Sequence, residues 1–166
     1  MKDVVFEQKN DLVNYLYSLL DNPTQIKVQK TMYLLFAYYG ATYGNLESDS
    51  SENDFEGQSY PKYLFEPQFE AWRYGPVDYE IYQNEKKNVY EKDSTFPTTS
   101  LNEQENKNIQ GFIKNIVSQT NNIDDFSLVD RTHQDNSWRL AYKEDSSPTK
   151  MNADDVINEY KDRYIS

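Results

Sequence analysis

The chain has 166 residues, a formal net charge of −11 and a sequence pI of about 4.5, a balance that disfavours ordinary nucleic-acid binding through phosphate neutralisation. It contains no cysteine, which excludes disulfides, thiolate metal sites and a cysteine nucleophile. The length favours a single domain over residues 1–166. Acidity serves solubility or steers the protein toward a basic partner surface, and composition leaves both interpretations open.

Aromatic residues make up 15% of the chain and include 15 tyrosines, so we expect a folded protein with a core rich in Tyr and Phe. The first ten residues, MKDVVFEQKN, lack the apolar run of a signal peptide. The segment TMYLLFAYYGATYG is too short and too polar to cross a bilayer. We therefore expect a soluble, cytoplasmic protein without membrane contact.

Two helices are predicted near the N-terminus. Leucines at helical spacing indicate the first, over residues 11–20. Asn22 is the expected N-cap of the second, with Pro23 at its first helical position. This second helix, about residues 23–40, is predicted to be central because its apolar face is broad: Met32, Leu35, Phe36 and Tyr39 follow the i, i+3, i+4, i+7 pattern.

An acidic segment follows, over residues 45–62. Five of the ten residues from Glu47 to Glu56 are acidic, and the spacing lacks the pattern of a calcium-binding loop. We expect an acidic mobile loop within the domain, because such a segment has little to bury.

A small β element is predicted near residues 64–75. Gly75 and Pro76 come next and fit a helix start, with Gly75 as the N-cap and Pro76 at the first helical position, where its missing N–H costs nothing. The stretch is therefore interpreted as a structural corner that begins a short helix.

The C-terminal half is predicted to be helical. Ser100 and Glu103 have capping-box spacing before a helix over residues 101–120, and a shorter helix is expected within 123–133. A final helix completes the chain. The fold class is mainly α, with α+β possible: a compact single-domain helical bundle around the central helix.

Motifs for catalysis are missing. His133 is the only histidine, and neither GxSxG nor a glycine-rich nucleotide loop is present. We expect His133 to be structural, hydrogen-bonded near Trp138, rather than catalytic. We therefore expect no enzyme activity, no metal site and no cofactor.

Two tryptophans admit two interpretations. Trp72 and Trp138 either pack in the core, which we favour, or anchor a partner. Arg73 alternates with Trp72 and should face another way, which makes it the better candidate for a surface anchor.

Three segments, in order, resemble the Panacea domain of the SocA-like antitoxin family. IKVQKTMYLLFAYYG (26–40) is similar to a helix written roughly KLQKLLYF, LFEPQFEAWRYGPVDYEIY (64–82) to LF-x-x-x-F-x-AW-x-YGPV, and LVDRTHQDNSWRLAY (128–142) to LS-x-x-TH-x-x-x-PW. MNADDVINEY stands where the family has a final helix. Ser137 departs from the usual Pro before the tryptophan.

The resemblance implies a mainly helical domain with a small β element, and an antitoxin that neutralises a toxin, encoded by an adjacent gene, through direct binding. The alternative is a phage-encoded acidic inhibitor that mimics nucleic acid and blocks a host defence or DNA-binding protein. The partner-binding surface is expected around the start of the central helix and the corner: Lys27, Lys30, Arg73, Tyr74 and Glu80. Residues expected to maintain the structure are Trp72, Gly75, Pro76, His133 and Trp138.

Overall fold

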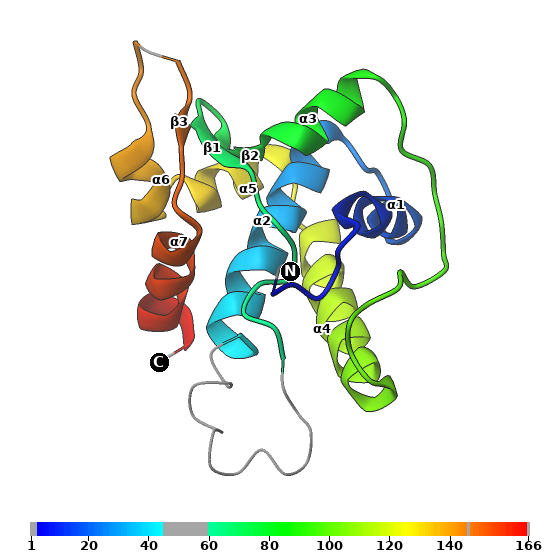
Figure 1. Cartoon of the computed structure of the whole chain (residues 1–166). Helices are drawn as coiled ribbons and strands as arrows, with labels where there is room; N and C mark the ends of the chain where they lie inside the picture. The colour runs from blue at the N-terminus through cyan, green and yellow to red at the C-terminus, as the bar shows by residue number, and fades with distance from the viewer. Residues whose placement is uncertain (1–2, 45–59, 146, 166) are drawn as a thin grey trace.

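The computed structural model describes residues 3–44, 60–145 and 147–165. Helices and a small antiparallel sheet form this part of the chain, which confirms the mainly α prediction with a small β element (Figure 1). The helices are α1 (Lys9–Leu19), α2 (Gln25–Thr42), α3 (Tyr79–Lys86), α4 (Glu103–Asn121), α5 (Asp125–Thr132), α6 (Asn136–Ala141) and α7 (Ala153–Tyr160), and the π-helical turn η3 (Lys161–Ile165) follows α7. The strands are β1 (Phe69–Trp72), β2 (Gly75–Asp78) and β3 (Thr149–Lys150).

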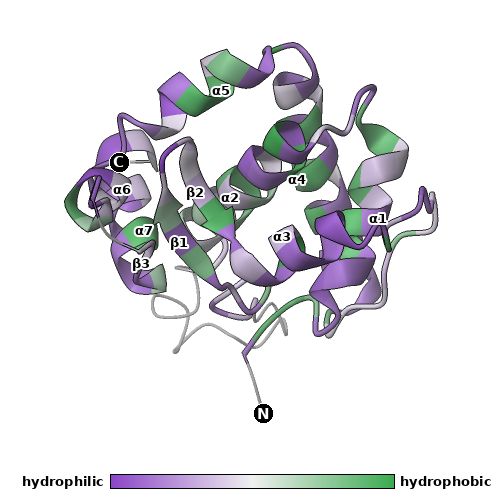
Figure 2. Ribbon diagram, turned by 90° about the horizontal axis from the view of Figure 1, so that it is seen from above, coloured by the Kyte–Doolittle hydropathy of each residue, from purple (hydrophilic) through white to green (hydrophobic). Residues whose placement is uncertain are grey.

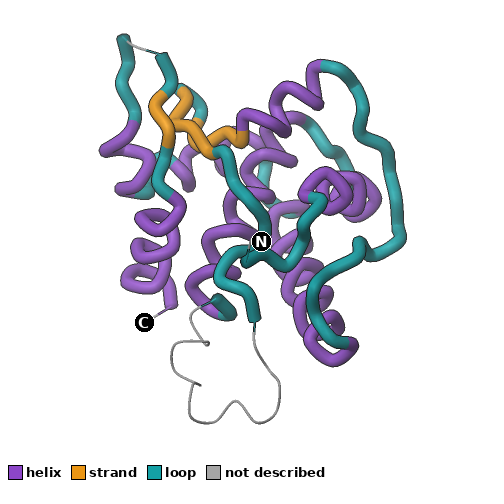
Figure 3. The backbone as a smooth tube through the Cα atoms, in the orientation of Figure 1, coloured by secondary structure: helices purple, strands orange, loops and turns teal. Residues whose placement is uncertain are grey.

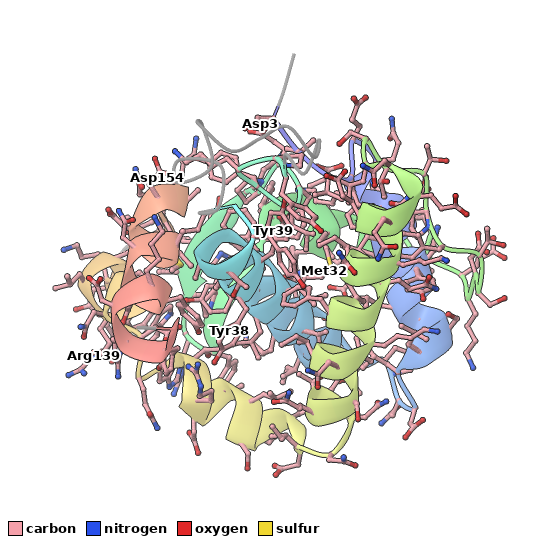
Figure 4. All side chains as sticks on the ribbon, turned by 90° about the horizontal axis from the view of Figure 1, so that it is seen from below. Asp3, Met32, Tyr38, Tyr39, Arg139 and Asp154 are labelled. Carbon is pink, nitrogen blue, oxygen red and sulfur yellow. The ribbon has the colours of Figure 1, made fainter. Side chains whose placement is uncertain are left out.

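Helix α2 is the centre of the fold, as predicted. It contacts α1, α3, α4, α5, α7 and β2 and is buried along most of its length. Apolar residues surround its C-terminal half, and the buried polar side chains of its first half, such as Lys27 and Lys30, bond neighbouring elements. Figure 4 places Met32, Tyr38 and Tyr39 in the middle of the molecule, among the surrounding helices. Phe36 packs against Phe65 and Phe69, with ring centroids 5.4 and 5.5 Å apart. The core is therefore largely aromatic.

The sheet has the order β2-β1-β3 and lies at one end of the helical bundle (Figure 3). Strands β1 and β2 form a hairpin in which Trp72 pairs with Gly75 and Phe69 with Asp78. Gly75 has a φ of 105°, and a Cβ there would lie 2.5 Å from Thr132 Oγ1, so both the backbone and the space require glycine.

The predicted helix start at Gly75 and Pro76 is wrong. Both residues belong to β2, an edge strand, where Pro76 is tolerated because an edge strand has one side free of ladder hydrogen bonds. The N-cap of α3 is Asp78, whose carboxylate accepts a hydrogen bond from the Ile81 N–H at 3.2 Å. A side-chain oxygen can accept from the first turn, which glycine cannot do.

Two other helix starts are shifted by two residues from their predicted positions. Thr24, not Asn22, caps α2, and its Oγ1 accepts from the Lys27 N–H at 3.1 Å. The capping box of α4 consists of Asn102 and Glu105 rather than Ser100 and Glu103. In both cases another residue that can cap a helix, two positions further along the chain, occupies the position.

Most of the predicted acidic loop, residues 45–59, lies outside the described residues. The end of it, residues 60–62, is described and packs against the domain. Tyr60 is buried, and the Tyr39 hydroxyl donates to the Pro61 carbonyl at 2.6 Å.

A buried carboxylate, Asp135, joins α2 to the C-terminal helices. Its Oδ2 accepts from the hydroxyls of Tyr33 (2.6 Å) and Tyr160 (2.7 Å), and its Oδ1 accepts from Arg131 at 3.0 Å. The Arg131 guanidinium also lies 4.4 Å from the Tyr164 ring centroid. These bonds compensate the cost of burying the charge.

A second buried carboxylate, Asp78, joins the hairpin, α3, α1 and α2. Lys9 Nζ donates to both of its oxygens, at 2.9 and 3.1 Å, and the Gln68 N–H donates at 3.0 Å. The Gln29 side-chain amide bonds both the N–H and the carbonyl of Asp78, at 2.8 and 3.2 Å. Asp78, which ends β2 and caps α3, thus attaches both elements to α2.

We expect Asp78→Asn to destabilise the protein by ~3–5 kcal/mol, because the buried Lys9 ammonium would lose its buried ionic partner. The matched control is Glu80→Gln: Glu80 lies 3.3 Å from the same ammonium but is half-exposed, so its loss should cost less than ~1 kcal/mol. Urea unfolding of the two variants measures both values. Equal effects would show that the Asp78–Lys9 pair does not hold the fold together.

Candidate partner-binding surface

The tip of the β1–β2 hairpin carries exposed side chains. Arg73 and Tyr74 form the turn, and Tyr74 is 51% exposed. The Tyr74 ring meets the ring of Phe126, at the start of α5, edge to face with centroids 6.4 Å apart. Phe126 is 62% exposed. An arginine and two aromatic rings therefore stand together on the surface, and we name Arg73, Tyr74 and Phe126 the hairpin tip.

A pocket of about 360 Å³ lies beside the hairpin tip. Its walls come from α2, α3 and the hairpin, which lie side by side in Figures 1 and 2 and contact one another. Most of the lining is apolar. We name it the hairpin groove, and its lining residues are Gln25, Ile26, Gln29, Lys30, Trp72, Arg73, Tyr74, Val77, Tyr82 and Glu85.

Two ionisable side chains line the groove from buried positions. Lys30 is 1% exposed, and its Nζ donates to the Pro76 carbonyl at 3.1 Å. Glu85 is 5% exposed; its Oε1 accepts from Gln29 Nε2 at 3.4 Å, and its buried Oε2 has no hydrogen-bond partner. A buried carboxylate oxygen without a partner is rare and costly in a folded protein.

Burial brings the pKa values of the two groups together. It lowers the pKa of Lys30 to about 7, an effect that attraction to Glu85 partly offsets. It raises the pKa of Glu85 to about 7, partly offset by the Gln29 hydrogen bond and by Lys30, whereas Asp78 adds to the rise. One acid and one base thus titrate near neutral pH in an apolar setting.

Trp72 is not a core residue, contrary to the favoured interpretation. Its ring is half-buried in the wall of the groove, edge to face with Tyr82 at 4.7 Å, and its Nε1 donates to Glu70 at 2.8 Å. Trp138 is buried, as expected. Residues two apart on β1 point to the same face, and sequence alone did not show that the Trp72 face is only partly covered.

The expected structural role of His133 fits its geometry. Its ring stacks on Trp138 with centroids 4.1 Å apart, and its Nε2 donates to the Arg73 carbonyl at 2.9 Å. Trp138 Nε1 donates to the adjacent carbonyl of Trp72 at 2.8 Å. Both side chains thus hold the hairpin turn from behind.

The predicted partner-binding residues fall into two groups. Arg73 and Tyr74 are exposed, and Glu80 is half-exposed, paired with Lys9. The expectation that Lys27 and Lys30 are exposed is wrong, because α5 and the hairpin cover that face of α2. Lys27 Nζ donates to the carbonyls of Thr120, at 2.7 Å, and Ile123, and so ties α2 to the end of α4.

Sequence reasoning did not select four residues that shape this surface: Ile26, Tyr82, Glu85 and Phe126. Tyr82 and Glu85 are three residues apart and therefore share a face of α3, a signal that could have paired them. Nothing in the sequence indicated that this face lies next to Lys30.

Lys30 should make stability depend on pH. Between about pH 7 and its ordinary pKa of 10.5, the unfolded chain holds a proton that folded Lys30 has released, so the free energy of unfolding should rise with pH across this window. Wild-type protein should therefore gain stability relative to Lys30→Met between pH 7 and 9.5 in urea unfolding.

Glu85→Gln supplies the opposite sign as a control. Folded Glu85 keeps a proton between about pH 4.5 and 7 that the unfolded chain has released, so the wild type should lose stability relative to this variant as pH rises through that window. Differences that stay constant with pH would contradict the burial of both groups.

Comparisons with known proteins point to one family. A model described as "Antitoxin SocA-like, Panacea domain" matches residues 54–139, more than half of the chain, including the hairpin, α3 and the start of α5. No curated protein and no solved structure matches. In the described part of the chain, no helix is long and apolar enough to cross a membrane, and no three His, Asp or Glu side chains are grouped to hold a metal ion. By the extent of the family match, the chain belongs to the SocA-like antitoxin, Panacea-domain family.

Proposed function

We propose that this chain is an antitoxin-type binding module that neutralises a cognate toxin, encoded by an adjacent gene, through direct protein–protein contact. Family membership supports an antitoxin role. In this proposal the protein acts by binding, without catalytic turnover, and does not bind nucleic acid. It works in the cytoplasm, where the toxin is made.

The observation that carries the proposal is the hairpin tip. Arg73, Tyr74 and Phe126 are exposed together beside a concave surface. Tyr and Arg are enriched among the residues that dominate binding energy, and aromatic rings are enriched in the buried centres of interfaces.

The tip is also preorganised for binding. Trp138 and His133 hold the carbonyls of Trp72 and Arg73, and Lys30 holds that of Pro76. A turn fixed in this way loses little conformational entropy on association, so more of the contact energy appears as affinity. The net charge of −11 favours a partner with a basic surface and speeds the encounter.

Co-expression with the product of the adjacent gene, followed by pull-down and a growth assay, tests the proposal. We expect the wild type to form a stable complex and to restore growth. Arg73→Glu and Tyr74→Ala should each weaken the complex by ~2 kcal/mol or more, about 30-fold, while leaving the fold intact. Lys107→Glu makes the same charge change as Arg73→Glu at an exposed position in the first half of α4, and should bind normally. Helix α4 starts at the end of the molecule away from the hairpin (Figure 1).

If no adjacent gene product binds, and the protein instead competes with DNA for a host nuclease or repressor, the alternative of a phage-encoded nucleic-acid mimic holds. If Lys107→Glu is as damaging as Arg73→Glu, the interface lies elsewhere or depends on overall charge alone.

A further inference from the structure

The buried polar side chains Lys30 and Glu85 form the floor of the hairpin groove and keep hydrogen-bonding capacity that the fold does not use. Lys30 Nζ can donate three hydrogen bonds, and the structure shows one, to the Pro76 carbonyl. Glu85 Oε2 has none. Both side chains line the groove, yet they do not form an ion pair with each other within the described part of the chain. The stability of the fold gives no reason to bury Glu85 and Lys30 beneath an apolar groove without pairing them with each other.

We propose that the hairpin groove is the pocket for a tyrosine side chain of the toxin, with its hydroxyl group between Lys30 and Glu85. This inference rests on the proposed function, because it names the side chain by which the partner would be recognised.

The size and walls of the groove fit an aromatic ring. Trp72 and Tyr82, which contact each other edge to face, contribute rings to the lining, and Ile26 and Val77 supply aliphatic surface. A volume of about 360 Å³ accommodates one large side chain together with part of its neighbours. Aromatic pairs in offset or edge-to-face geometry are favourable beyond the burial of area.

The floor selects a neutral group that both donates and accepts. Whether Lys30 and Glu85 are both charged or both neutral, the pair has no net charge and offers at least one donor and one acceptor. An incoming carboxylate would face Glu85, and an incoming ammonium or guanidinium would face Lys30. A phenol hydroxyl, which donates one hydrogen bond and accepts others, suits both residues.

Binding needs one small movement. Glu85 Oε2 is inaccessible to solvent, so its carboxylate must rotate toward the groove to meet the hydroxyl. That rotation gives up only the 3.4 Å contact with Gln29 and satisfies an oxygen that had no partner. The side chain of Gln29 remains held by the backbone of Asp78.

The first test uses p-cresol, the side chain of tyrosine, with the full-length protein and no toxin. Backbone and indole NMR shifts of the wild type should show p-cresol binding at Trp72, Tyr82 and Val77, and at least tenfold weaker binding of toluene, which lacks the hydroxyl. The variants Lys30→Met and Glu85→Gln, checked for folding by the same spectra, should lose this preference for p-cresol. Equal binding of the two probes to the wild type, or shifts outside the groove, would overturn the proposal.

The second test uses the complex, in which each exposed tyrosine of the toxin is changed to Phe and to Ala. One position should lose at least tenfold in affinity as Phe, and more as Ala, with the Phe effect absent against Glu85→Gln. If the complex forms normally but no tyrosine shows this coupling, the pocket proposal fails while the antitoxin proposal stands. If p-cresol binds as expected but no toxin complex forms, the proposed function fails and the groove is a site for a free phenolic ligand.

Discussion

The candidate binding surface depends on one buried side chain, Asp78. Its carboxylate accepts hydrogen bonds from Lys9 of α1, from the Ile81 N–H in the first turn of α3 and from the Gln68 N–H. Its backbone is hydrogen-bonded to Gln29 of α2. Strand β2 and α3, which form two walls of the hairpin groove, therefore meet α2 at a fixed angle. Without this joint, neither the groove nor the orientation of the hairpin tip would be defined.

A second constraint comes from placing polar side chains on a helix that is covered on all sides. Lys27, Lys30 and Tyr33 extend from α2 to the end of α4, to the hairpin and to Asp135, respectively. Each buried polar group needs its own partner, so each fixes how one neighbouring element docks. Aromatic packing stabilises the core, and the buried polar side chains of α2 determine how the neighbouring elements are positioned on it. Within the described residues, two buried side-chain oxygens, Glu85 Oε2 and Ser137 Oγ, have no hydrogen-bond partner in the fold.

Much of the fold could be predicted because local patterns determine it. The broad apolar face identified α2 as central, and the final helix buries Val156, Ile157 and Tyr160. Helix starts were harder to predict, because several residues within two positions can serve as the cap, as Thr24 and Asn102 show. The structural assignment of His133 fits its contacts. The burial of Lys27 and Lys30, the strand at Gly75 and Pro76, and the half-exposure of Trp72 depend on elements distant in sequence, which periodicity does not reveal.

The central claim is that the hairpin tip and groove form the surface that binds the toxin. Hydrogen–deuterium exchange of the full chain, alone and with the product of the adjacent gene, tests it most directly. The account predicts new protection at residues 72–75, at the start of α2, along α3 and at the start of α5, with no change in α4 near Lys107. Protection confined to α4, α6 or α7, with the hairpin unchanged, would contradict it.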